Sequence, residues 1–431
     1  MLRTANTLLP LLLALWINVL PAQNRREKVA WLRENAAAVR IDPDNEDYQD
    51  LEALGVAIGE ARVVLLGEQS HQDGSTFTAK VRLIKYLHQE LGFDVLAFES
   101  PMWDLNRAWP EVAAGQPCLP AMDSAIFNIW SYAAELQPLW RYVEAQRAQM
   151  RPLELAGFDC QAHFLTLNHF AADFLDQCER QQSGYRNSTA GQRTQLALDS
   201  LFQGKMRGRG LSAENRAFFL AELARWEKVW AAGDNPEAAW WAQQMRSLGQ
   251  NTRNTWEYNY QRSFANSDSV RSRRDRQMGE NLLWLLNGPY RGKKIILWGA
   301  SLHFARNLAT SGRSMYKGLT LMGDVLWEAL GEKMYSLGFI AYQGEVGQIG
   351  AEERWEIDLK RKSLSGLLTE AEFAAAFVDL RQPAPGGEWL GQRTLMRPFG
   401  YGDHRMHWPR HLDGMLFIRD MEPPQRRTEN R

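Results

Sequence analysis

The amino-acid sequence predicts an α/β protein, in which helices flank a mostly parallel β-sheet and a large helical insertion lies at about residues 163–287. Three observations lead to this prediction. Short apolar runs of strand length alternate with stretches in which apolar residues recur every three or four positions. The first runs follow the order strand, helix, strand. A long helix-rich stretch then separates the third strand from the fourth, so the 431 residues are expected to form one enlarged core.

The first strand–helix–strand unit spans residues 63–98. Its two strands are the apolar runs 63–66 and 94–98, of which the first ends at Gly67. Between the strands, four apolar residues recur at helical spacing before Gly92 ends the helix: Val81, Ile84, Leu87 and Leu91. A crossover helix joins parallel strands, so the unit predicts that these two strands are parallel neighbours.

The remaining elements follow the same two patterns. Apolar runs predict five further strands, at 153–158, 294–298, 334–342, 373–380 and 415–418. Helical patterns cover 123–150, 163–182, much of 211–257 and 278–286. The helix-rich stretch between the third and fourth strands therefore forms the predicted insertion.

The N-terminus has the layout of an export signal. Arg3 precedes the apolar stretch 8–20, which ends at Pro21-Ala22 and is followed by polar residues. We therefore expect a signal peptide at 1–22, a mature domain at 23–431 and a periplasmic or secreted protein. The apolar stretch is short for a membrane span, so no stable span is expected once the signal is removed. An uncleaved anchor is the alternative.

Composition excludes some functions. The 50 Lys and Arg residues nearly balance the 51 Asp and Glu residues, which excludes a generally basic nucleic-acid-binding protein. The 17 Trp residues argue against disorder. Three cysteines leave two alternatives open, a disulfide between Cys160 and Cys178 or free thiols, and no Cys/His zinc spacing occurs.

Polar residues follow four of the predicted strands, where open α/β sheets bind their ligands. They are Glu68 with His71, then Glu99, Asp159 and His303. A histidine near its ordinary pKa can take a proton from water, and a carboxylate can orient its ring. The same residue types can bind a divalent metal. Glu99 and Asp159 have helix capping as a structural alternative.

Other histidines and two serines have simpler interpretations. His88 is expected on the surface, and so is the C-terminal group His404, His407 and His411. Ser70 and Ser301 are poor candidate nucleophiles because neither lies in a Gly-x-Ser-x-Gly turn.

Five sequence blocks together resemble the erythromycin esterase family. They are LLGEQSH at 65–71, FE at 98–99, GFDCQ at 157–161, RDRQM at 274–278 and the segment 296–303. The family fold is similar to that of haem-binding lipoproteins. The resemblance implies that Glu68, His71, Glu99 and His303 line the active cleft, with His71 as the base that activates water. It also implies that Arg274 and Asp275 shape the cleft.

This chain departs from the family pattern at three positions. Ala300 stands where the family usually has a His, Ser301 where it has an Asn, and Lys80 where it has an Arg. Lysine keeps the positive charge but lacks the planar two-point fork of arginine. We expect substrate contacts from Lys80, Asp159, Arg274 and Asp275.

The leading hypothesis is an exported hydrolase that cleaves a small-molecule ester or lactone, with a macrolide lactone as the family's named substrate and no required cofactor. The first alternative is a metal-dependent hydrolase or peptidase that uses the same residues as ligands of a divalent metal. The second is a non-catalytic protein that binds a bulky apolar ligand. That alternative depends on five tryptophans of the insertion: Trp226, Trp230, Trp240, Trp241 and Trp256.

Overall fold

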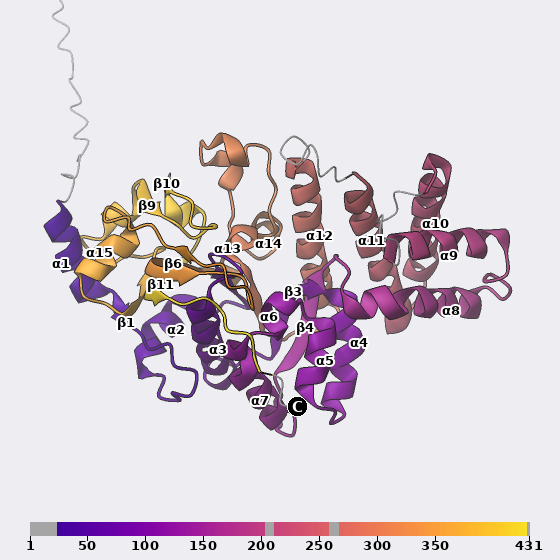
Figure 1. Ribbon diagram of the computed structural model, residues 1–431, viewed down its shortest axis with the longest axis horizontal. Helices are drawn as coiled ribbons and strands as arrows, with labels where there is room; N and C mark the ends of the chain where they lie inside the picture. The colour runs from indigo at the N-terminus through magenta and orange to yellow at the C-terminus, as the bar shows by residue number, and fades with distance from the viewer. Residues whose placement is uncertain (1–23, 203–210, 258–266, 429–431) are drawn as a thin grey trace, which may run out of the picture.

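A central sheet organises the computed structural model, which describes residues 24–202, 211–257 and 267–428. The order of its strands is β1-β8-β11-β6-β2-β5-β3-β4, and β7 pairs with β6 (Figure 1). Their bounds are β1 Ala37–Ala38, β2 Val63–Glu68, β3 Val95–Pro101, β4 Glu154–Asp159, β5 Ile295–Ala300, β6 Met334–Val346, β7 Trp355–Glu356, β8 Ala375–Asp379 and β11 Gly414–Met421. A separate two-stranded sheet pairs β9 (Thr394–Met396) with β10 (His404–Met406). The predicted signal peptide, 1–22, lies outside the described residues.

The sheet is mostly parallel, which confirms the predicted fold class. β11, β6, β2, β5, β3 and β4 pair in parallel, whereas β8 runs antiparallel to β11, and β1 antiparallel to β8. One prediction about neighbours is wrong. β2 and β3 do not pair, because β5 lies between them and pairs with both. A crossover connection makes two strands parallel, but it leaves room for a later strand of the chain to lie between them.

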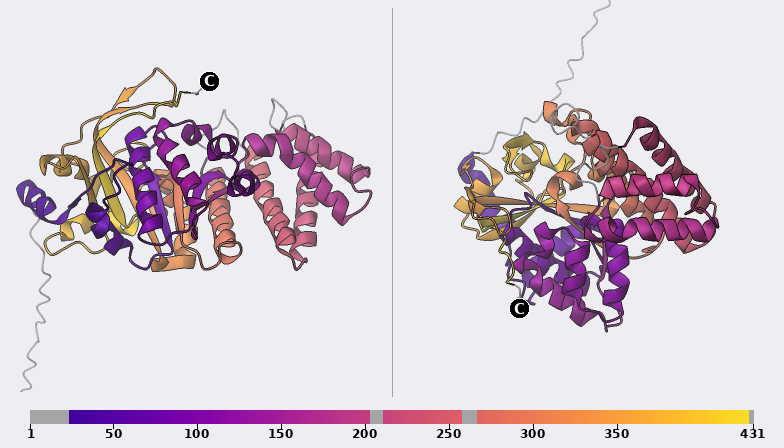
Figure 2. Two further views of the ribbon diagram at one scale, coloured as in Figure 1. Left: turned by 90° about the horizontal axis from the view of Figure 1, so that it is seen from below. Right: turned by 45° about the vertical axis from the view of Figure 1, so that its right-hand side comes forward.

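Helices cover both faces of the sheet, so its central strands are buried on both sides and are apolar at almost every position. On one face, α3 (Gly74–Gln89), α4 (Met102–Ala113) and α7 (Gln137–Gln146) pack against side chains such as Leu66 and Phe98. On the other face, α12 (Ser267–Asn287) and α14 (Met322–Leu330) pack against Val63, Leu65 and Leu297. Figure 2 shows the sheet between these two helical layers.

The helix-rich stretch between β4 and β5 projects from one end of the sheet (Figure 1). The projecting part contains α8 Ala171–Gln181, α9 Thr189–Phe202, α10 Ala213–Ala231 and α11 Pro236–Glu257, and the stretch ends with α12, which packs against the sheet. Trp226 and Trp230 stack with ring centroids 5.0 Å apart, and Trp230 lies 5.6 Å from Trp241. All three are buried in the core of the insertion, and Trp240 and Trp256 pack against it. These tryptophans therefore pack the core of the insertion. They do not form the wall of an apolar ligand site, which the binding-protein alternative requires.

Several helices were absent from the sequence prediction. They include α1 Arg25–Asn35, α2 Glu52–Ile58, α4, α9, α14 and α15 Leu364–Glu370. The stretch predicted as helical at 123–150 is broken into α5 Cys118–Ala125, α6 Asn128–Ser131 and α7. The break follows from Ile126 and Phe127, whose extended backbone separates α5 from α6.

Three histidines predicted on the surface are buried. His88 exposes 2% of its surface, and its ring bonds to the Tyr142 hydroxyl and the Arg151 carbonyl. His404 and His411 are also buried, because the β9–β10 sheet and the following turn pack against the main core. Of the two cysteine alternatives, the structure has free, buried thiols at Cys118, Cys160 and Cys178.

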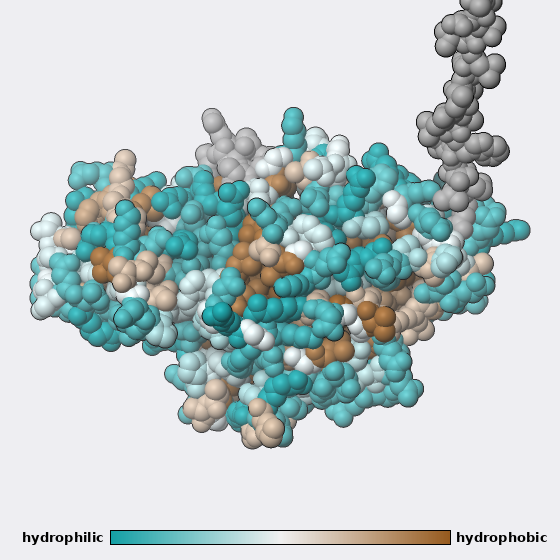
Figure 3. Space-filling view, turned by 180° about the vertical axis from the view of Figure 1, so that it is seen from behind, coloured by the Kyte–Doolittle hydropathy of each residue, from teal (hydrophilic) through white to brown (hydrophobic). Residues whose placement is uncertain are grey.

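Figure 3 shows a mostly hydrophilic face with apolar areas near its centre. Within residues 24–202, 211–257 and 267–428, the structure has no helix with the length and apolarity needed to cross a bilayer.

Candidate active site

The sheet brings the predicted polar residues together at one edge. β2, β5, β3 and β4 are adjacent and parallel, so their carboxyl ends meet. Glu68 ends β2, Glu99 lies near the end of β3 and Asp159 ends β4. His303 lies in α13 (Ser301–Phe304), the single turn of helix that follows β5.

His71 and Glu68 form a pair in which only the imidazole is open to solvent. His71 Nδ1 lies 2.7 Å from Glu68 Oε1, and the His71 side chain is 40% exposed while that of Glu68 is fully buried. Trp130 Nε1 donates to the same Glu68 oxygen at 2.9 Å, and its ring meets the imidazole edge to face. With Nδ1–H donated to the carboxylate, Nε2 is the nitrogen that can accept a proton.

The environment tunes the basicity of His71. Burial lowers the pKa of its imidazole, but the hydrogen bond that the ring donates to Glu68 and the charges of Glu68 and Glu99 more than offset burial. The net pKa of His71 therefore lies above its ordinary value.

Lys80 lies beneath this pair. Its ammonium is fully buried and donates to Glu68 Oε2 and, at 3.2 Å, to the Gly299 carbonyl. The ammonium also lies 4.5 Å from the centre of the Trp298 ring. Lys80 was expected to contact substrate, but its side chain is fully buried and bonds to Glu68.

A second set of charges centres on Arg274, which comes from α12. Its Nη2 donates to Glu99 Oε1 at 2.8 Å and to Asp159 Oδ2 at 2.6 Å. Glu99 Oε2 also accepts from the Ala300 backbone N–H at 2.9 Å. Asp159 and Glu99 therefore hold an arginine, and the helix-capping alternatives for them do not describe the structure. Asp159 is buried behind Arg274, which is 21% exposed, so Arg274 is the member of this pair that reaches the cleft.

His303 completes the site as a cation. Its Nδ1 lies 2.6 Å from Asp275 Oδ1 and its Nε2 lies 3.3 Å from Glu99 Oε1. Burial lowers the pKa of His303, but Asp275 and Glu99 outweigh it and raise the pKa to about 10. Burial raises the pKa of Glu99, yet the nearby His303 and Arg274 charges hold it well below its ordinary range. Asp275 is fully buried and acts on the cleft through His303.

The arrangement separates a base from an electrophilic side. His71 offers an exposed ring whose Nε2 can accept a proton, while His303 and Arg274 carry positive charge at neutral pH. The four residues predicted to be catalytic thus lie in one constellation. Sequence reasoning missed Trp130, since a single tryptophan in a helical stretch gives no signal that its indole N–H meets a carboxylate 62 positions earlier.

The described residues contain no group of three or more His, Cys, Asp or Glu side chains in a metal-binding arrangement. The Glu68 carboxylate accepts hydrogen bonds from Lys80 and Trp130. The Glu99 carboxylate accepts hydrogen bonds from Arg274 and a backbone N–H.

Comparison with known proteins decides the family. The family model described as erythromycin esterase matches residues 88–421, more than three quarters of the chain. The chain belongs to the erythromycin esterase family. Membership indicates a hydrolase, and it confirms the resemblance seen in the five sequence blocks.

Three known proteins are similar to this chain. YbfO of Bacillus subtilis (strain 168), named as a candidate hydrolase, is 26% identical over 91% of both chains. The crystal structure of a succinoglycan biosynthesis protein is 18% identical and covers 94% of this chain and 99% of its own, with a TM-score of 0.76. A mutant of the erythromycin esterase EreC in its open conformation is 15% identical, covers 90% of this chain and 98% of its own, and has a TM-score of 0.66. These structural likenesses show a shared fold.

Proposed function

We propose that this protein is an exported hydrolase that cleaves an ester or lactone with water activated by His71. One observation carries the proposal: an exposed imidazole is paired through Nδ1 with a buried carboxylate, beside the cationic pair His303 and Arg274. Membership of the erythromycin esterase family agrees with it.

The reaction follows from the positions of these groups. Water attacks the carbonyl carbon as His71 Nε2 takes its proton, and Glu68 stabilises the imidazolium that forms. The carbonyl oxygen becomes an oxyanion, which the positive charges of His303 and Arg274 stabilise. When the intermediate collapses, the bond from carbon to the alkoxy oxygen breaks. The proton on His71 then passes to that oxygen, which gives an acid and an alcohol.

Hydrolysis of 4-nitrophenyl butyrate and of a macrolide lactone, by wild type and His71→Ala, tests this proposal. We expect kcat to fall about 10²- to 10⁴-fold in the variant. His169→Ala is the matched control, since His169 is exposed and lies on the segment before α8. Equal rates for wild type and His71→Ala would remove His71 from the mechanism.

Chelation separates this proposal from the metal-dependent alternative. The carboxylates at the site are already paired with Lys80 and Arg274, so we expect hydrolysis to survive dialysis against EDTA. Loss of activity on dialysis, with recovery on adding one divalent metal, would favour the metalloenzyme.

Export is part of the proposal and has its own test. Expression of the full chain in a bacterium, followed by N-terminal sequencing, is expected to give a periplasmic or secreted protein that begins at or near Gln23. A protein that retains residues 1–22 in the membrane fraction would instead indicate an anchor.

A further inference from the structure

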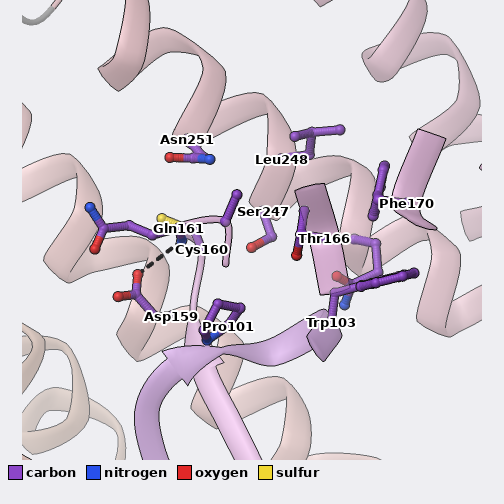
Figure 4. A pocket seen from close by; sticks show the side chains of 12 residues that line it. Pro101, Trp103, Asp159, Cys160, Gln161, Thr166, Phe170, Ser247, Leu248 and Asn251 are labelled. Carbon is purple, nitrogen blue, oxygen red and sulfur yellow. Dashed lines mark hydrogen bonds between the residues drawn. The ribbon is translucent and has the colours of Figure 1, made fainter. Parts of the chain in front are cut away.

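The two sides of the candidate active site are held in place differently. On the side of β4, the helical insertion packs closely against the ends of β3 and β4. In Figure 4, Asp159, Thr166 and Ser247 are among the residues that line the space between these strand ends and α11. The cavity there has a volume of about 20 Å³, which is room for about one water molecule. This side of the site is therefore fixed by close packing.

The side that carries His71 depends on Trp130. The indole N–H donates to Glu68 Oε1 at 2.9 Å, and the indole ring meets the His71 imidazole edge to face with ring centroids 5.2 Å apart. Trp130 is fully buried. One side chain therefore fixes both the carboxylate and the imidazole of the proposed base.

Trp130 lies on α6, a single helical turn of four residues. A helix this short does not stabilise itself, because forming the first turn fixes many dihedral angles for one hydrogen bond. The last carbonyl groups of a helix also lack partners within it. Contacts from outside must therefore fix the position of α6 and, with it, the position of the indole.

Arg427, near the end of the described chain, supplies such contacts. Its backbone N–H donates to the Tyr132 carbonyl at 3.0 Å, and its Nη1 donates to the Ser131 carbonyl at 2.5 Å. Its guanidinium also makes a two-point contact with the carboxylate of Asp123, which lies on α5. A cation suits this end of a helix, where the backbone carbonyls carry partial negative charge. Arg427 thus satisfies carbonyls at the end of α6 and joins α6 to α5.

Arg427 belongs to the segment 422–428, which we call the strap. The Glu422 carbonyl accepts from the backbone N–H of Gly74 at 2.8 Å, and Gly74 begins α3 directly after the loop that carries the proposed base. The Gln425 carbonyl accepts from the backbone N–H of Ala134 at 2.8 Å, shortly after α6. The strap therefore contacts the chain on both sides of the base, at the start of α3 and at the end of α6.

We propose that Arg427 is a positioning residue for hydrolysis, because through α6 it holds the Trp130 indole against His71. The proposal rests on the hydrolase function proposed above and adds the strap to its machinery. Since Arg427 bonds to α5 and α6 and not to the reacting groups, its effect must pass through Trp130. Its loss should lower kcat and leave KM nearly unchanged, because the base acts only in the transition state.

A double-mutant cycle on 4-nitrophenyl butyrate hydrolysis tests this route. We expect Arg427→Ala and Trp130→Phe each to lower kcat about tenfold, since small displacements of a catalytic group are costly. Arg427→Ala/Trp130→Phe should be no slower than Trp130→Phe, because two residues that act through one contact are not additive. Arg427→Lys should recover part of the loss, since lysine keeps the charge but lacks the two-point fork.

Arg62→Ala is the matched structural control. Arg62 donates to the backbone carbonyls of Leu286, Tyr290 and Lys293. It directly precedes β2, so it lies at the opposite end of that strand from Glu68. Arg62→Ala should lower the urea midpoint of unfolding, as Arg427→Ala does, and leave kcat and KM at their wild-type values.

A second measurement needs no turnover. In a ¹⁵N NMR spectrum, the indole N–H signal of Trp130 is identified by its loss in Trp130→Phe. Buried and hydrogen-bonded N–H groups exchange slowly with solvent deuterium. Relative to the other buried indoles of the same sample, we expect this N–H to exchange at least about tenfold faster in Arg427→Ala, and at the wild-type rate in Arg62→Ala.

The outcomes separate the two proposals. An unchanged kcat in Arg427→Ala, additive losses in the double variant, or unchanged exchange of the Trp130 indole would overturn the positioning role and leave the hydrolase standing. Faster exchange in Arg427→Ala, without hydrolysis of any ester by wild type, would support the contact between the strap and Trp130 and overturn the hydrolase, together with the role of Arg427 in hydrolysis.

Discussion

At the scale of single residues, Glu68 is the shared partner of three side chains at the site. Its buried carboxylate accepts from His71, Trp130 and Lys80. The first contact orients the base, the second fixes the carboxylate, and the third neutralises its charge. A buried carboxylate and ammonium are tolerated because each is the partner of the other.

Substitution of Glu68 should separate its catalytic role from its structural one. In Glu68→Gln, we expect kcat to fall about 10²- to 10⁴-fold, because the amide no longer stabilises the imidazolium. The unfolding free energy should fall by about 3–5 kcal/mol, because Lys80 becomes an unpaired buried charge. Urea unfolding measures the second effect. Glu68→Gln/Lys80→Met should recover stability and stay inactive, and recovered activity in that double variant would contradict the role of Glu68.

The raised pKa of His71 predicts how hydrolysis depends on pH. The neutral imidazole is the active form, so kcat/KM should rise with pH through a midpoint above about 6.5, the ordinary histidine value. A pH–rate profile measures this midpoint. Glu68→Gln should move any residual midpoint downward, since it removes the main source of the upward shift. A midpoint below 6 in wild type would argue against His71 as the base.

The raised pKa of His303 predicts that the stability of the fold depends on pH. Its pKa is about 10 in the folded protein and about 6.5 when unfolded. The folded state therefore binds the proton more tightly, so this stabilisation is complete below about pH 6.5 and is lost as pH rises through about 10. Urea unfolding of wild type and His303→Gln at pH 6, 8 and 10 should show a stability difference that shrinks toward pH 10. A constant difference would mean that His303 is not charged in the folded state.

At the scale of elements, β2 and α13 approach each other closely at Gly67. A Cβ placed on Gly67 would lie 2.6 Å from Ser301 Oγ and 2.7 Å from Ser301 Cα. The Ser301 hydroxyl donates to the Gly67 carbonyl at 2.7 Å, which joins the end of β2 to the start of α13. This contact sets the separation of the elements that carry Glu68 and His303.

Gly67→Ala should therefore disturb the site by pushing β2 and α13 apart. We expect the unfolding free energy to fall by about 1–3 kcal/mol, as in other overpacked cores, and ester hydrolysis to fall with it. Gly391→Ala is the matched control, because nothing lies within 4 Å of its added Cβ. Denaturant unfolding and the hydrolysis assay, run on both variants, check this. Equal behaviour of the two variants would show that β2 and α13 can move apart freely.

At the scale of the whole molecule, a late segment of the chain holds the loop that carries His71. The Gly400 backbone N–H donates to the Gln69 carbonyl at 2.8 Å, and Gln69 Nε2 donates to the Arg397 carbonyl at 2.7 Å. The Tyr401 hydroxyl donates to Asp73 at 2.8 Å across 328 positions. Tyr401 has a φ of 61°, a strained value that is kept where surrounding contacts fix it.

Tyr401→Phe should loosen this loop. The buried Asp73 carboxylate would lose a donor, so we expect the unfolding free energy to fall by about 1–3 kcal/mol and kcat to fall severalfold. A double-mutant cycle with Asp73→Asn should give a coupling energy of about 1 kcal/mol. Additive effects of the two substitutions would contradict a direct link between these residues.

The sequence predicted much of the fold because local patterns carry that information. Seven of the sheet strands lie where apolar runs placed them, since strands buried on both faces must be apolar throughout. It also predicted that Glu68, Glu99, Asp159 and His303 meet, because parallel strands deliver their carboxyl ends to one edge. The position of β5 between β2 and β3 was not predictable, since pairing partners depend on contacts across 200 residues or more.

The roles within the site were decided by the tertiary structure. From the sequence, Lys80, Asp159 and Asp275 could each contact a substrate. The tertiary structure shows that all three are buried. Lys80 bonds to Glu68, Asp159 to Arg274 and Asp275 to His303. The sequence alone determined which residue types arrive at the edge of the sheet. The tertiary structure decided which of them face the cleft and what charge they carry, because burial and partners set pKa, and both arise from segments distant along the chain.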